Sequence, residues 1–175
     1  MNLVRSGLEN APWETTAALL DTRRQAELQN NQALLDRRLA YLLLRLTLGI
    51  NILLHGAVRV PALGAFAAGT VQQFADTPLP AVAVRLFGLS LPFLETAIGL
   101  LLTVGLWTRW ALVAGALLIV ALVFGTALRS DWETLSIQML YAIIYYLLLT
   151  GRTSDYFALD TVCTKRLGRS KSACA

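Results

Sequence analysis

Several polar side chains lie within or beside a stretch that is apolar enough to cross a bilayer. Residues 39–60 read LAYLLLRLTLGINILLHGAVRV, and this run contains Arg45, Asn51, His55 and Arg59. A charged side chain at the centre of a bilayer costs at least about 2.5–3.5 kcal/mol. Such residues normally face a protein interior or a wet cavity, where they pair with one another or serve a function.

Two other apolar segments also carry polar residues spaced three or four apart, which places those residues on one helical face. At about 1.5 Å per residue, Arg45, Glu95 and Tyr145 lie at similar depths, roughly 18–21 Å from the outer surface. We therefore predict a buried ion pair between Arg45 and Glu95, because neither charge is tolerable alone in lipid. The sequence leaves open whether this pair only joins two helices or also serves a function.

A second group of polar residues lies nearer the outer surface. Its members are His55, Arg59, Arg85, Gln138 and Tyr141. Cationic and amide donors around an outward cavity could bind an anion or the carbonyl groups of a quinone. The same side chains could instead contact lipid headgroups. Because the chain has a single His and two Cys, neither a metal site nor a haem is expected.

Composition and length indicate the elements that must hold these residues. The 175-residue chain is 56% hydrophobic and 15% charged, whereas globular domains average about 25% charged residues. Apolar stretches lie at 39–59, 81–106, 109–129 and 133–150, each near the length of about 20 residues that a spanning helix needs. We predict an all-α membrane four-helix bundle over residues 39–150, with lipid as its surroundings.

The flanking segments complete the predicted architecture. Residues 1–38 are expected to form a cytoplasmic helical segment, either a plain surface helix or an interfacial helix that binds a partner. Between the first two spans, residues 64–75 should form a short helix on the outer surface. Phe66 and Phe74 of this helix should face the bilayer or cover the mouth of the bundle. Residues 151–175 are expected to be a basic cytoplasmic tail, and the net charge of +4 reflects such flanks rather than nucleic-acid binding.

The chain resembles the DoxX family of small four-helix membrane proteins over about residues 40–160. The resemblance rests on His55-Gly56, on Glu95 followed by Gly99, on the turn GLWTR at 105–109, and on Leu159-Asp160. The family takes its name together with a subunit of a membrane thiosulfate:quinone oxidoreductase, and other members look like accessory subunits of redox or stress-response systems. The resemblance implies a bacterial inner-membrane protein with a partner subunit.

Two functional hypotheses follow, and the sequence does not decide whether the chain is an enzyme. In the first, the chain is a membrane subunit of a quinone-linked oxidoreductase, with a sulfur compound as a possible electron source. Quinone would then bind among the spans, and Glu95 would relay protons or balance Arg45. In the second, the chain is a non-catalytic scaffold that recruits partners through its cytoplasmic ends, and it could also form a homo-oligomer. Solute transport is a third, weaker hypothesis, because no inverted repeat is visible.

The distribution of basic residues predicts that both termini are cytoplasmic. Eleven Lys and Arg residues flank the spans on the side of the termini, whereas only Arg59 and Arg129 flank them on the other side. Cys163 and Cys174 in intact cells should therefore resist a membrane-impermeant thiol reagent and react after permeabilisation. Labelling of both cysteines in intact cells would reverse the assigned topology.

Overall fold

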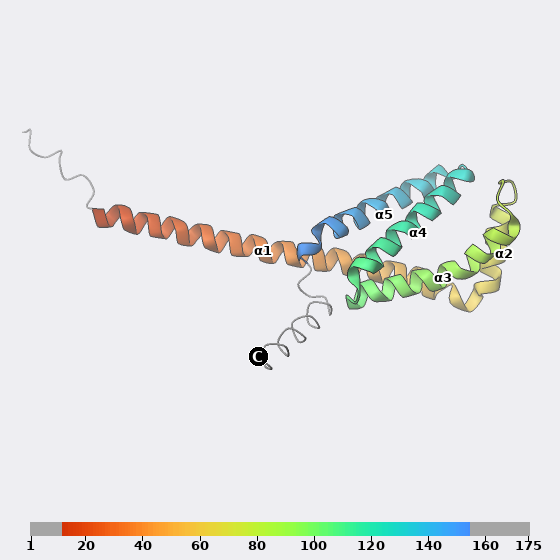
Figure 1. Cartoon of the computed structure of the whole chain (residues 1–175), viewed down its shortest axis with the longest axis horizontal. Helices are drawn as coiled ribbons and strands as arrows, with labels where there is room; N and C mark the ends of the chain where they lie inside the picture. The colour runs from red at the N-terminus through yellow and green to blue at the C-terminus, as the bar shows by residue number, and fades with distance from the viewer. Residues whose placement is uncertain (1–11, 155–175) are drawn as a thin grey trace, which may run out of the picture. The chain divides into compact units, whose positions relative to one another are not determined.

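The computed structural model describes residues 12–154, and every element in this range is helical. The elements are α1 (Pro12–Ala57), η1 (Val60–Ala62), α2 (Leu63–Gln73), α3 (Ala81–Val104), α4 (Thr108–Leu128), α5 (Trp132–Thr150) and η2 (Gly151–Ser154). The predicted all-α class is confirmed (Figure 1). The predicted tail beyond Ser154, with Cys163 and Cys174, and the first eleven residues lie outside the described range.

Four segments are long and apolar enough to cross a membrane: Ala18–Gln73, Ala81–Val104, Thr108–Leu128 and Trp132–Thr150. Large apolar side chains cover their outer surfaces, including Leu54, Leu117 and Phe124. Water would not favour so much exposed apolar area, whereas lipid chains would. The chain is therefore a multi-pass membrane protein whose helices contact lipid.

Helices α3, α4 and α5 begin and end within two residues of the predicted spans, but the first segment differs. We expected a span over 39–59 preceded by a separate helical segment, whereas α1 runs unbroken from Pro12 to Ala57. Residues 13–48 contain neither Pro nor Gly, so the chain offers no break at the predicted boundary. The chain nevertheless divides into two compact units, 1–39 and 40–175. Within the first unit, Leu20, Leu28 and Leu35 are exposed.

Close contact between α1 and α3 depends on glycines. A Cβ added to Gly99 of α3 would collide with the backbone of Leu53, and one added to Gly56 of α1 would collide with Pro92 and Thr96. Gly49 lies equally close to Thr103, where an added Cβ would be 2.8 Å from the hydroxyl. These contacts fix the antiparallel register of the two helices, since only small residues permit backbones to approach this closely.

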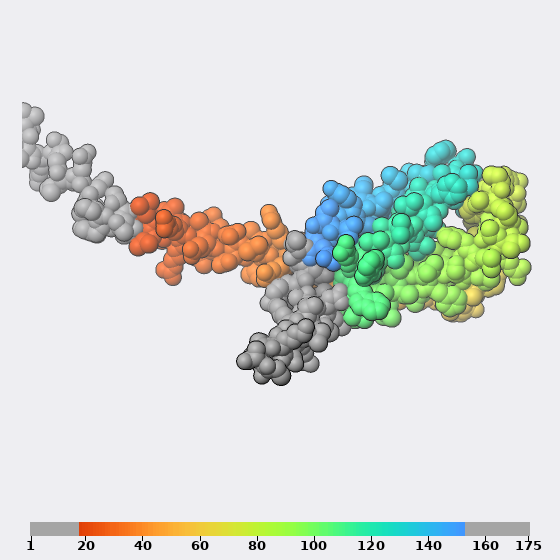
Figure 2. All heavy atoms as spheres, viewed as in Figure 1, coloured from red at the N-terminus to blue at the C-terminus, as the bar shows by residue number. Residues whose placement is uncertain are grey.

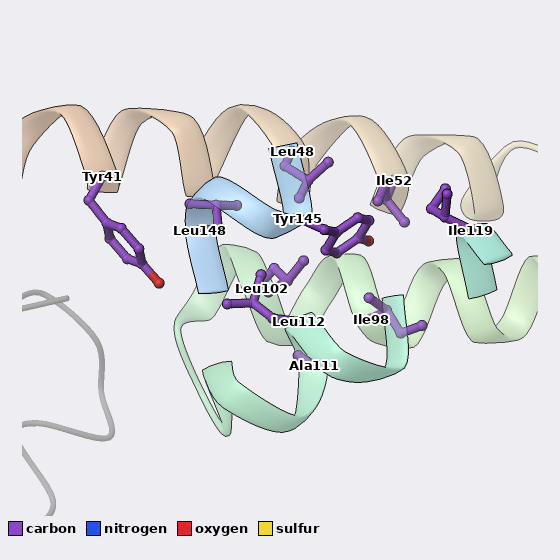
Figure 3. Packing of buried hydrophobic residues seen from close by; sticks show 10 residues of the cluster. All are labelled: Tyr41, Leu48, Ile52, Ile98, Leu102, Ala111, Leu112, Ile119, Tyr145 and Leu148. Atoms are coloured by element: carbon purple, nitrogen blue, oxygen red, sulfur yellow. The ribbon is translucent and has the colours of Figure 1, made fainter. Parts of the chain in front are cut away.

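Helices α4 and α5 form an antiparallel hairpin that packs on α3 at one end only. The buried cluster consists of Tyr41, Leu48, Ile52, Ile98, Leu102, Ala111, Leu112, Ile119, Tyr145 and Leu148 (Figure 3). Tyr145 lies near its centre, and its phenol rests against Gly115, where any Cβ would clash. Beyond this cluster, α3 and the α4–α5 hairpin diverge toward α2 (Figure 1).

The short helix α2 links the diverging helices at their open end. It agrees with the helix expected over 64–75, although its place at the membrane surface remains a prediction. Ala67 is buried against Gly88 of α3, where an added Cβ would be 3.3 Å from the Ala67 Cα. At the other end, the ring of Phe74 lies 3.1 Å from the Cβ position of Gly125 in α4.

The glycine contacts give a direct test of the helix arrangement. Gly99→Ala should destabilise the protein by about 1–3 kcal/mol, because the new methyl group overlaps the backbone of Leu53. The matched control is Gly64→Ala in α2, where nothing lies within 4 Å of an added Cβ. The control should be neutral or slightly stabilising, since Ala favours helix over Gly. Thermal unfolding in detergent measures both, and equal melting temperatures for the two variants would contradict the α1–α3 contact.

Candidate functional site

A cavity of about 800 Å³ occupies the space between the diverging helices. Helices α1, α2, α3, α4 and α5 all contribute to its wall, and Ile52, Ile119 and Tyr145 separate it from the buried cluster. The space-filling view shows the molecule hollowed between α4 and α2 (Figure 2). Its volume lies within the range of about 300–1,000 Å³ that is typical of ligand sites.

An ion pair between Arg59 and Glu95 anchors the polar part of the cavity. Arg59 Nη1 donates to Glu95 Oε2 at 2.7 Å, and Glu95 is only 7% exposed. The other terminal nitrogen, Arg59 Nη2, lies 3.4 Å from Nδ1 of His55. The guanidinium also stacks on Phe66 of α2, 4.9 Å from the ring centroid. Arg59 thus joins α1, α2 and α3 at one side of the cavity.

The predicted partnership between Arg45 and Glu95 is wrong, because Glu95 pairs with Arg59. Leu53 lies level with Gly99 and Gly49 with Thr103, so Glu95 is level with the end of α1. That point is about twelve residues from Arg45, or roughly 18 Å along the helix. The depth estimate had assumed that α1 and α3 start at the same outer level. Arg45 is buried and engaged in an interaction of its own.

Two further hydrogen bonds cross the cavity wall. The Tyr141 hydroxyl of α5 donates to Asn51 Oδ1 of α1 at 2.8 Å, and Gln138 Nε2 donates to the Thr126 hydroxyl of α4 at 2.9 Å. Gln138 Oε1 is buried and has no hydrogen-bond partner. An unsatisfied buried acceptor costs about 1–3 kcal/mol, so this oxygen is available to a ligand that carries a hydroxyl.

Asn51 and Thr126 were not among the predicted site residues. Asn51 lies one helical turn before His55 on the same face of α1, and that spacing was a usable signal. Thr126 had no such signal, because α4 carries few polar residues and its neighbour Gln138 belongs to a different helix.

Aromatic residues of α2 close the cavity toward the α4–α5 turn. The Arg129 guanidinium lies over the Phe74 ring at 5.3 Å, and it also approaches Asp131 at 3.4 Å. Asp131 caps α5: the backbone N–H and hydroxyl of Thr134 both donate to its carboxylate and lower the pKa of Asp131. Phe66 and Phe74 therefore cover the cavity mouth, one of the two positions expected for them.

Arg85 is not brought to this cavity. It lies in a separate, smaller groove with Ala68, Val71, Ala81 and Val82. The anion hypothesis relied on Arg59 and Arg85 acting together, yet Arg59 is paired with Glu95. The cavity is therefore better suited to a neutral, mainly apolar molecule with a few hydrogen-bonding oxygens than to an anion.

Comparisons with family models, with curated proteins and with solved structures found no match. The resemblance to the DoxX family accordingly stays a prediction. Within residues 12–154, no group of three or more His, Cys, Asp or Glu side chains could hold a metal ion.

The Arg59–Glu95 pair can be tested by a double-mutant cycle. Arg59→Leu and Glu95→Leu should each destabilise the protein, because each leaves a charge unpaired in an apolar cavity. Since the Arg59 side chain is 31% exposed, we expect losses near the lower end of about 3–5 kcal/mol. The double variant should recover much of this loss.

The cycle is measured by thermal unfolding in detergent. Arg85→Leu is the matched control, because Arg85 is exposed and forms no ion pair within residues 12–154. If the two single losses simply add in the double variant, the ion pair does not contribute to the stability of the bundle.

Proposed function

We propose that this chain is the quinone-binding membrane subunit of an oxidoreductase in the bacterial inner membrane. The observation that carries the proposal is the convergence of His55, Arg59, Gln138 and Tyr141 on one mainly apolar cavity of about 800 Å³. These are four of the five residues predicted as ligand candidates, and they come from two helices far apart in the sequence. The resemblance to the DoxX family points to the same class of function.

The side chains match the chemistry of a quinone. Quinone carbonyls accept hydrogen bonds, and the Arg59 guanidinium, the His55 ring and the Gln138 amide are donors on the cavity wall. The orphaned Gln138 Oε1 is an acceptor, which suits the hydroxyl of the reduced quinone. Phe66, Phe87 and Leu91 supply apolar surface for the ring.

A bound quinone would supply the acceptance of electrons and protons that no side chain of this cavity provides. Electrons would come from a partner subunit, with a sulfur compound as a possible source. The Glu95 carboxylate lies beside Arg59 and His55, within the set of polar groups that a reduced quinone would meet. Glu95 is therefore the candidate proton acceptor of the site.

A non-catalytic scaffold is the second candidate. It is favoured by the exposed leucines Leu20, Leu28 and Leu35, which lie on one side of α1 within residues 12–39 and could bind a partner helix. In this proposal the cavity would hold only lipid. Both candidates place the two termini in the cytoplasm.

Direct binding separates the two candidates. Protein purified in mild detergent should carry extractable quinone, and in lipid nanodiscs it should bind ubiquinol or menaquinol at equilibrium. Gln138→Met should weaken quinol binding about three- to tenfold, because it removes one or two hydrogen bonds worth about 0.5–1.5 kcal/mol each.

Arg85→Gln is the control, since Arg85 lies outside the cavity. Its affinity should match that of the wild type. Wild-type protein that neither carries nor binds quinone, but retains a partner protein through residues 12–39, would overturn the quinone proposal in favour of the scaffold.

A further inference from the structure

The polar and apolar parts of the cavity are segregated onto different walls. Asn51, His55, Arg59, Glu95, Gln138 and Tyr141 lie on α1, the middle of α3, and α5. Across the cavity, the first half of α3 and the central part of α4 contribute only apolar side chains. Examples are Ala83, Phe87, Leu118, Ala121 and Phe124. A ligand that satisfies both walls must be polar at one end and apolar at the other.

The apolar wall is also open toward the outside of the molecule. Ala83 of α3 and Ala121 of α4 line the cavity and are nevertheless exposed, and Phe124 is 61% exposed. Because α3 and α4 are both candidate membrane spans, their exposed apolar sides face lipid chains. The small alanine side chains leave the gap between the two helices unfilled. The cavity is thus continuous with the bilayer rather than only with water at the mouth.

The size of the cavity supports an occupant larger than a single ring. Ligand sites begin at about 300 Å³, whereas this cavity measures about 800 Å³. The space beyond a quinone ring lies along the apolar wall of α3 and α4. A polyprenyl chain could begin there and leave through the gap, since its full length cannot fit inside.

We propose that the gap between α3 and α4 is a lateral opening to the bilayer and that the ligand carries a long polyprenyl tail. The head group lies against the polar wall, and the tail passes Ala83 and Ala121 into the lipid. This inference rests on the proposed quinone-binding function and adds the class of quinone and its route of access. Ligands held by the head group alone do not use the gap.

The test compares two probes in lipid nanodiscs, ubiquinone with a full polyprenyl tail and its tail-less head group, dimethoxymethylbenzoquinone. Ala83→Trp and Ala121→Trp fill the gap with a large side chain. Each should weaken binding of the tailed ubiquinone at least tenfold and leave binding of the tail-less head group within about twofold of the wild type. The matched controls, Leu86→Trp and Val120→Trp, place the same side chain at exposed positions of α3 and α4 outside the cavity. These controls should bind both probes as the wild type does.

Each outcome decides one of the two proposals. If Ala83→Trp and Ala121→Trp keep full affinity for the tailed ubiquinone, or lose both probes equally, the lateral opening is overturned while the proposed function stands. If the wild type binds neither probe, the proposed function is overturned together with this inference. Unchanged binding of the tail-less probe also shows that the variants are folded.

Discussion

The close approach of α1 and α3 is the constraint on which the other features of this protein depend. Gly56 and Gly99 allow the two backbones to touch, and this contact fixes one helix along the other. In that register Arg59, at the end of α1, reaches Glu95 in the middle of α3. Without the glycines the helices would separate, and each charge would have to find another partner in a medium that solvates neither.

The cavity follows from the same register. Because α1 ends level with the middle of α3, the first half of α3 extends beyond it and packs on α2 instead, through Gly88 and Ala67. Helix α2 then spaces α3 from the α4–α5 hairpin, with Phe74 against Gly125. Tyr145 and its neighbours pack the opposite end (Figure 3). A bundle that is packed at one end and propped open at the other necessarily encloses a hollow.

Local signals in the sequence predicted the elements well, but long-range register could not be read from them. Apolar length defined α3, α4 and α5 to within two residues, and prolines marked the segment that contains α2. Helical spacing also placed His55, Arg59, Gln138 and Tyr141 on inward faces, which was sufficient to bring them to one cavity. The pairing of Glu95 failed because it required the relative height of two helices, which depends on glycine contacts between them. Arg85 has the spacing of the inward residues, yet it lies in a groove next to α2, which no pattern within α3 reveals.

The open apolar wall between α3 and α4 has a thermodynamic consequence. A hollow that is continuous with the bilayer is not empty, because acyl chains of the surrounding lipid enter it when no other molecule is there. Occupation by a ligand is then an exchange of one hydrocarbon chain for another, and this exchange releases little free energy, since lipid is as apolar as the cavity wall. Selectivity must come from the few polar groups around Glu95. The apparent affinity will also vary with the chain length and packing of the host membrane.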